Sequence, residues 1–360
     1  MRIRVAILTV ALAAILVVAL PVLAAADLTA ALDYLEAQQN TDGGFGSGFS
    51  PDSTIGSTAD TVLAIVAAGG DLAAFDQEGN TPLTYLEANA SSAASAGDLA
   101  KLILATIAAG ENPRTLGGVD SVAKLESLSG TGGRIGGEAD TFVSHLLAVL
   151  ALASAERPIS TEAVGDIVNA QQENGSWAWD GSAETAGDTN TTAFAVQALV
   201  AAGQDLASDP IANALVYYQD IQNEDGGWPY QNPSDYGTAT DANSTAVTIQ
   251  AIVAAGQDPA SAAWTADDGS TPVAALEALQ NPSGAFAWQA TMPDDNLLAT
   301  IQALPALAGK AFPFATMDVG QATAPVTAPE TGGGAVALAL PLLLSGLALA
   351  GGGYLLNRKK

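Results

Sequence analysis

The sequence predicts an all-α domain: an α/α toroid of the α6/α6 type, with about six helix pairs across residues 27–314. Three observations predict this fold. A short segment recurs along the domain, an apolar helix follows each copy, and glycines mark where the helices stop. Apolar helices would form an inner ring and amphipathic helices an outer ring, with an open solenoid as the alternative.

The recurring segment ends the first helix of each pair. It holds an apolar residue, a glutamine four residues later, a polar gap, a glycine and an aromatic residue. Glycine ends a helix because it takes a left-handed conformation without strain. The glutamine amide can then bind free carbonyls of the last turn. Degenerate copies lie at 85–89 and 124–128; the clear copies carry Gln39 and Phe45, Gln172 and Trp177, Gln222 and Trp228, and Gln280 and Phe286.

The second helix of each pair is apolar on nearly every face, which indicates burial. The best copies span 58–69, 192–203 and 245–256, and each ends in Ala-Ala-Gly. Their small residues allow neighbouring helices to approach closely, as an inner ring requires.

The glutamine-to-aromatic segments resemble the QW motifs of squalene–hopene cyclases and prenyltransferase-like repeats, over most of residues 27–307. The resemblance implies an α/α toroid but no particular reaction, because the superfamily also holds protein prenyltransferases, thioester domains and cobalamin-binding, intrinsic-factor-like domains. The cyclase Asp-x-Asp-Asp acid is missing, and the nearest acidic pairs are 267–268 and Asp294-Asp295. The cysteine that prenyltransferases and thioester domains need is also missing.

Elimination therefore favours a non-catalytic binding module for a small ligand. The resemblance suggests cobalamin as that ligand, although no second, smaller domain of the kind found in cobalamin binders is visible. No other cofactor is evident. One alternative is a terpene cyclase or prenyltransferase-type enzyme with an atypical acid, for which Asp294 and Asp295 are the candidates. A structural protein that presents an interaction surface is the other.

Acidic residues recur near the start of each inner helix and would ring one mouth of the toroid. They either cap the helices or form a polar ring for a ligand or for a hard cation such as calcium. Two copies match closely, in which Asp188 precedes Asn190 and Asp241 precedes Asn243. The other acids are Asp60, Asp98, Asp140 and the pair Asp294-Asp295.

Aromatic residues also recur two positions after the motif aromatic, at Trp179, Tyr230 and Trp288. Their shared position indicates either packing or a platform for a flat or sugar-like ligand. His145, the only histidine, falls in an apolar helix, which is typical of a buried and satisfied side chain rather than a base.

The two ends of the chain predict export and anchoring. Residues 1–26 read as a signal peptide cleaved after Ala26, with an uncleaved anchor as the alternative. Residues 315–333 read as a flexible linker that ends in Ala328-Pro329-Glu330-Thr331-Gly332, similar to the Leu-Pro-x-Thr-Gly signal that a sortase cuts after its threonine, here Thr331. Residues 334–356 would span the membrane and 357–360 form a basic cytoplasmic tail. We expect an extracellular domain tethered to the membrane or, through a sortase, to the cell wall.

Composition excludes two classes of partner. The formal net charge is −27, from 38 acidic and 11 basic residues, so the chain should repel nucleic acid. With no cysteine and a single histidine, we expect no metal site of the ordinary zinc type.

Overall fold

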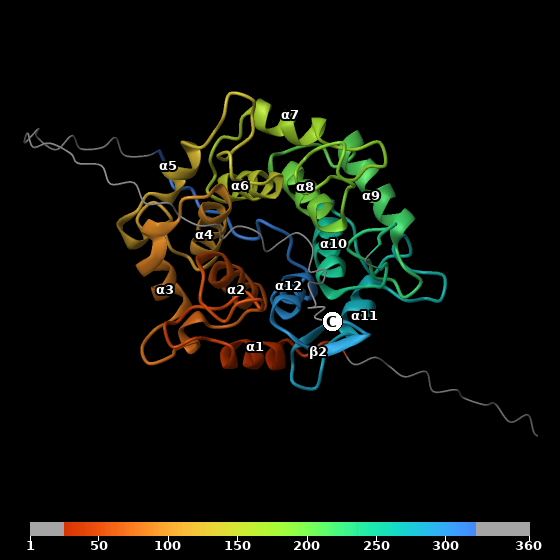
Figure 1. Ribbon diagram of the computed structural model, residues 1–360, viewed down its shortest axis with the longest axis horizontal. Helices are drawn as coiled ribbons and strands as arrows, with labels where there is room; N and C mark the ends of the chain where they lie inside the picture. Colours follow the sequence, from red (N-terminus) through yellow and green to blue (C-terminus); the bar gives the residue numbers. More distant parts are fainter. Residues whose placement is uncertain (1–24, 236, 322–360) are drawn as a thin grey trace, which may run out of the picture.

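The computed structural model describes residues 25–235 and 237–321, which form two concentric rings of helices (Figure 1). We call each outer helix and the inner helix that follows it a unit, numbered 1 to 6 from the N-terminus. The inner helices are α2 (Ile55–Ala67), α4 (Ala96–Ala108), α6 (Phe142–Ser154), α8 (Thr189–Ala201), α10 (Ala242–Ala254) and α12 (Leu297–Leu307). The outer helices are α1 (Leu28–Ala37), α3 (Pro82–Asn89), α5 (Ser121–Glu126), α7 (Thr161–Asn169), α9 (Asp209–Ile221) and α11 (Pro272–Glu277).

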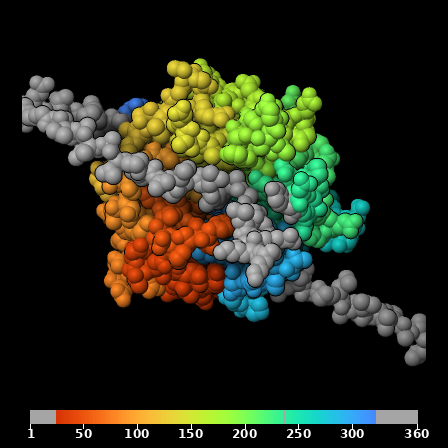
Figure 2. All heavy atoms as spheres, viewed as in Figure 1, coloured from red at the N-terminus to blue at the C-terminus, as the bar shows by residue number. Residues whose placement is uncertain are grey.

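The inner ring is closed. Each inner helix packs against the next, and α12 packs against both α10 and α2. Units 1 and 6 accordingly lie side by side, as the red and light-blue regions at the bottom of Figure 2 show. The predicted toroid is therefore confirmed over the open solenoid. No helix among the described residues is long and apolar enough to cross a membrane; the predicted span, 334–356, falls outside them.

The connections contain one departure from the all-α expectation. Strands β1 (Phe286–Gln289) and β2 (Met292–Asn296) form an antiparallel hairpin between α11 and α12. The hairpin fills the segment between the motif aromatic Phe286 and the first residue of α12, whereas the corresponding segment of unit 1, between Phe45 and Ile55, forms no strand. Three short 3₁₀ helices complete the connections: η1 (Leu72–Ala74), η2 (Ala90–Ser92) and η3 (Leu116–Gly118).

The inner helices run parallel, with their N-terminal ends at one mouth of the barrel. Thr54, Ser95, Thr141, Asp188, Asp241 and Asn296 each cap one of them by accepting a backbone N–H bond. Glycines with positive φ follow the C-terminal ends at positions 69, 110, 203, 256 and 309. Unit 3 differs, because Glu156 takes this left-handed position with φ 50°.

The segment after α12 folds back over the C-terminal ends of the inner helices; we call residues 311–321 the strap. It crosses the ring from α12 toward α4 and α6 (Figure 1). Ser154, the last residue of α6, donates to the Ala315 carbonyl at 2.8 Å and accepts from the Met317 amide through its own carbonyl at 2.8 Å. The linker predicted from residue 315 is thus wrong for 315–321, because these residues bond to the toroid. Residues 322–333 lie outside the described part.

Candidate functional site

The motif glutamines join neighbouring units rather than form a ligand site. The side-chain amide of Gln222 donates to the Gly226 carbonyl at 2.8 Å and to the Trp264 carbonyl, in the loop before α11, at 2.9 Å. Gln39 bonds likewise to Gly43 and Phe75. Gln280 bonds to Gly284 and to Asp27, which closes the ring from unit 6 to unit 1.

In unit 4 this role belongs to Gln171, not to Gln172 as predicted. Gln171 donates to the carbonyls of Gly175 at 2.9 Å and Pro210 at 2.8 Å. Gln172 instead holds the following loop through the carbonyls of Ser182 and Thr185. Two adjacent glutamines made the register ambiguous in the sequence, and the spacing of four residues to the glycine resolves it.

The motif aromatics are fully buried and have a shared partner. The backbone N–H of each donates to a threonine hydroxyl at the fourth position of the following inner helix, at 2.9–3.0 Å. The indole N–H groups of Trp177 and Trp228 also bond to carbonyls of their outer helices. The four pairs are Phe45 with Thr58, Trp177 with Thr192, Trp228 with Thr245, and Phe286 with Thr300.

His145 occupies this same fourth position in unit 3. Its Nδ1 accepts the Ile135 N–H at 3.0 Å, and its Nε2 donates to the Ala163 carbonyl at 3.2 Å. Burial lowers the pKa of His145 to about 4, although Asp166 opposes the shift. A neutral ring with both nitrogens bonded to backbone is a structural substitute for threonine, so His145 has no free nitrogen for proton transfer.

The acids near the inner-helix starts do not form one ring. Asp188 and Asp241 cap α8 and α10, where each carboxylate accepts from an N–H and a hydroxyl, of Thr191 and Ser244 respectively. Burial raises the pKa of Asp188 to about 6 and that of Asp241 to about 7. Tyr230 contacts Asp188 through its hydroxyl.

Asp294 and Asp295 lie in the exposed strand β2, not in the first turn of α12 as their context suggested. Asp295 accepts from the Asn281 side chain at 2.7 Å and from the Ser283 hydroxyl at 2.8 Å. They do not face an apolar cavity, so the arrangement does not meet the requirement for an acid that protonates an alkene.

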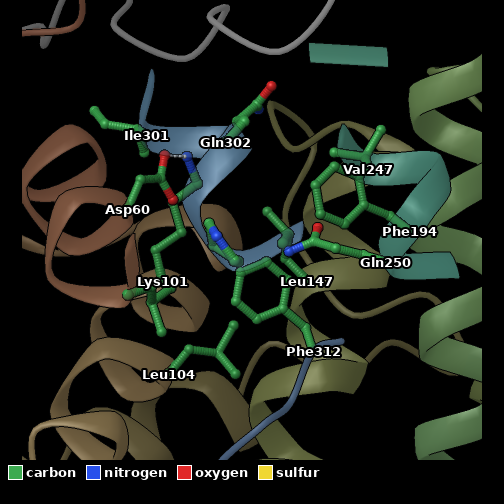
Figure 3. Close-up of a pocket in the computed structure, with 12 residues that line it drawn as sticks. Asp60, Lys101, Leu104, Leu147, Phe194, Val247, Gln250, Ile301, Gln302 and Phe312 are labelled. Carbon is green, nitrogen blue, oxygen red and sulfur yellow. Dashed lines mark hydrogen bonds and ion pairs between the residues drawn. The ribbon is translucent and has the colours of Figure 1, made fainter. Parts of the chain in front are cut away.

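The barrel lumen is almost filled. The sixth residue of each inner helix points into it and forms one layer: Asp60, Lys101, Leu147, Phe194, Val247 and Gln302. Lys101 bonds to Asp60 at 2.6 Å (Figure 3). Phe312 of the strap and Gln250 also line this space, whose volume is only about 40 Å³. The Gln250 amide nitrogen is buried without a hydrogen-bond partner in the described part.

Sequence reasoning missed most of the lumen residues. Aligning the six inner helices by their caps would have revealed the shared sixth position of Lys101 and Gln302. No repeat pattern pointed to Phe312, because the strap occurs once in the chain.

A second cavity, of about 550 Å³, opens at the mouth between units 1 and 6; we call it the cleft. Its walls come from the end of α1, the loop 46–51, β1, β2 and the starts of α10 and α12, and they include Tyr34, Gln38, Phe49, Asn243, Trp288 and Asp295. Asn243 donates to Gln302 at 2.7 Å, so the cleft and the lumen adjoin at this pair.

Only two of the predicted ligand residues, Asn243 and Trp288, line the cleft, whereas Asp188 and Tyr230 contact each other away from it. Trp179 packs against the main hydrophobic core. Asn190 lies in the first turn of α8, and its buried side-chain oxygen has no partner among the described residues. Asp188, Asp241 and Tyr230 do not line the cleft. No cluster of three metal-ligating side chains occurs in 25–235 or 237–321.

Comparison with known proteins supports this fold. Residues 137–292 match the squalene-hopene cyclase C-terminal domain, and residues 2–91 match the prenyltransferase alpha-alpha toroid domain. No curated protein matches the chain.

Among solved structures, the type II terpene cyclase MstE from Scytonema is 14% identical with a TM-score of 0.55, and covers 78% of this chain and 96% of its own. A protein from Actinoplanes is 15% identical with a TM-score of 0.55, covering 78% and 98%. Haptocorrin in complex with Cbi is 17% identical and covers 80% and 67%, but its TM-score of 0.47 carries no conclusion about a ligand here. The two domain matches and these structures show that the chain has the α/α-toroid fold that is found in terpene cyclases.

Proposed function

We propose that this protein is a surface-displayed, non-catalytic toroid that binds a small ligand in the cleft. The contrast between its two cavities carries the proposal. Small-molecule sites usually enclose about 300–1,000 Å³. The cleft, at about 550 Å³, falls in this range, whereas the lumen of about 40 Å³ does not. A prenyl chain or a corrin would need the lumen side chains and the strap to move aside.

The carboxyl groups support the same proposal. A protonating acid needs an apolar cavity that also admits the alkene. Asp188 and Asp241 have raised pKa values, but their oxygens bind the first turns of their own helices. Asp60 is the one carboxyl that lines the lumen, where burial raises its pKa and the bonded Lys101 opposes that shift. A lumen this small leaves no room for a substrate beside it.

The enzyme alternative is tested by incubating the purified protein with squalene and with a geranylgeranyl aromatic compound, followed by product analysis. We expect no cyclised product from the parent or from Phe312→Ala, which enlarges the lumen. Cyclised product that disappears in Asp60→Asn would overturn the non-catalytic assignment. Product that disappears in the double variant Asp294→Asn/Asp295→Asn would overturn it in favour of the acid pair.

The binding role is tested by a thermal-shift screen of a chemically diverse small-molecule library that includes cobinamide. A ligand that binds only the folded state raises the melting temperature. Gln38→Trp should abolish the shift, because Gln38 is exposed on α1 and a larger side chain there fills the cleft without entering the core. Ligand-induced shifts that are all unchanged in Gln38→Trp would reject the cleft as the site.

Surface display is inferred from the sequence of residues 1–26 and 328–356, and the geometry of the toroid is compatible with it. The strap lies over the C-terminal ends of the inner helices, whereas the cleft is at their N-terminal mouth. A tether after residue 321 would therefore leave from the end opposite the cleft and present the cleft outward. External protease should release the domain from intact cells, and protection from protease would reject this location. A wall-linked terminus at Thr331 would indicate sortase processing, and a retained 334–356 segment a membrane anchor.

A further inference from the structure

Three aromatic rings line the cleft and remain accessible. Tyr34 and Trp288 are half-buried on α1 and β1. Phe49, in the loop 46–51, is 71% exposed, more than any other large hydrophobic side chain among the described residues. Phe49 therefore adds an accessible aromatic ring to the cleft that Tyr34 and Trp288 also line.

Several polar groups of the cleft lack a partner in the described part of the chain, whereas others, such as the Asp295 carboxylate, are bonded. The Trp288 indole N–H, the Tyr34 hydroxyl and the Gln38 amide make no hydrogen bond to any described residue. Asn243 donates through its amide nitrogen to Gln302, and its side-chain oxygen accepts no hydrogen bond from a described residue. Donors and acceptors thus lie between aromatic faces.

The charge of the cleft excludes several ligand classes. No lysine or arginine lines it, and Asp295 is its one charged side chain. With a net charge of −27, the protein as a whole also repels anions. Phosphorylated and carboxylated ligands are disfavoured on both grounds. A wholly apolar chain is disfavoured because it would take the unpaired polar groups out of water without offering hydrogen bonds, at about 1–3 kcal/mol for each group.

We propose that the cleft binds a short neutral oligosaccharide. A neutral sugar offers an apolar face of C–H groups that packs on an aromatic ring and a rim of hydroxyls that both donate and accept. Trp288 supplies the packing face, with Tyr34 and Phe49 beside it. Gln38 and Asn243 bind hydroxyls. This inference rests on the proposed function, since it names the ligand class of the same cleft.

Titration calorimetry of the purified protein with neutral trisaccharides tests the inference: maltotriose, cellotriose, mannotriose and chitotriose, with trigalacturonate as the anionic comparison. We expect at least one neutral trisaccharide to bind and trigalacturonate to bind at least ten-fold more weakly. Trp288→Ala should weaken binding at least ten-fold and Gln38→Ala about three-fold. Trp179→Ala is the matched control, because Trp179 has the same repeat position in unit 4 but lies outside the cleft; its affinity should match the parent.

Circular dichroism of each variant ensures that only folded protein is compared. Gln38→Ala removes an exposed side chain, so it should not affect folding. Equal affinity in Trp288→Ala and the parent would overturn the inference, as would tighter binding of trigalacturonate. If no neutral trisaccharide binds but library compounds still give shifts abolished by Gln38→Trp, the glycan inference fails and the proposed function stands. If no compound of either kind responds to Gln38→Trp, both fail.

Discussion

The two halves of the ring are held together in different ways. In units 1, 4, 5 and 6, a glutamine, a glycine and a buried aromatic bind each loop to the next outer helix. Units 2 and 3 have only degenerate copies of this motif, and the strap crosses the ring on that side. Arg114 and Arg157, which follow α4 and α6, bond to the carbonyls of Val319 and Gly320. The strap thus joins units 2 and 3 on the side of the ring where the repeat motif is degenerate.

Removing a motif aromatic should give the largest effect. Trp228→Ala deletes a fully buried ring, its bond to the Tyr218 carbonyl and its edge contacts with Tyr218 and Trp264. We expect the free energy of unfolding to fall by about 3–5 kcal/mol in urea denaturation. Trp228→Phe keeps a ring but loses the indole N–H bond, so its free energy of unfolding should fall by clearly less than that of Trp228→Ala. Equal losses in the two variants would mean that the hydrogen bond, not the packing, dominates.

Loosening the strap should give the next effect. The Arg114 side chain is only 7% exposed, and it bonds to Asp120 as well as to the strap. Arg114→Met leaves the Asp120 carboxylate and the Val319 carbonyl without this partner. The free energy of unfolding should fall by about 2–3 kcal/mol. It should also speed proteolysis within 311–321. Arg134→Met, an ion-pair variant on the outer side of unit 3, serves as the control. Equally fast cleavage of the strap in the parent and in Arg114→Met would contradict the role of the strap in holding units 2 and 3 together.

Units 4 and 5 differ from the other units because their inner helices have acidic caps, whereas the other four caps are uncharged. The stability that these two caps contribute should therefore depend on pH. The pKa values of Asp188 and Asp241 are raised, so folding favours their protonated forms. Their contribution is complete below about pH 4 and is lost as the pH rises through about 6 and 7. Asp188→Asn/Asp241→Asn should therefore stabilise the protein at pH 8 by on the order of 2 kcal/mol, with little change at pH 4.

The stability of the double variant minus that of the parent, measured from pH 4 to pH 8, isolates this effect. The opposite contribution of His145, whose pKa is lowered, is common to both proteins and cancels. A difference that stays constant over this range would show that the two carboxyls titrate normally.

The smallest effect concerns the end of α6. Glu156 has a positive φ where five other inner helices have glycine. Glu156→Gly removes the strain on Cβ and should raise the free energy of unfolding by about 0.5–1 kcal/mol. Thermal and urea unfolding can resolve this gain. Gly203→Ala, at the equivalent position of unit 4, is the reciprocal variant and should destabilise by a similar amount; a gain in both variants would contradict the explanation.

Much of the fold could be predicted from local pattern. The helix pairs, the glycine stops and the six-fold repeat follow from residue spacing, because helix periodicity and helix termination are local properties. The position of His145 in an apolar helix likewise indicated a buried side chain. The register of Gln171 and Gln172 could also have been decided, since the bonded glutamine precedes its glycine by four residues in all four clear copies.

The site depended on tertiary structure. Asn243 and Trp288 were candidates by repeat position, but Asn190, Trp179 and Tyr230 have equivalent positions and lie elsewhere. Only ring closure brings α1, the loop 46–51 and β1 beside α12 to form the cleft. The acids predicted to form one ring have different surroundings: Asp188 and Asp241 cap helices, Asp60 forms an ion pair, Asp140 accepts from the Ala96 amide, and Asp294 and Asp295 lie in an exposed strand. A side chain's surroundings are set by residues distant in the chain. The sequence by itself determined the repeating unit; the closure of the ring and the path of the strap decided which cavity is open, since both depend on contacts between residues far apart in the chain.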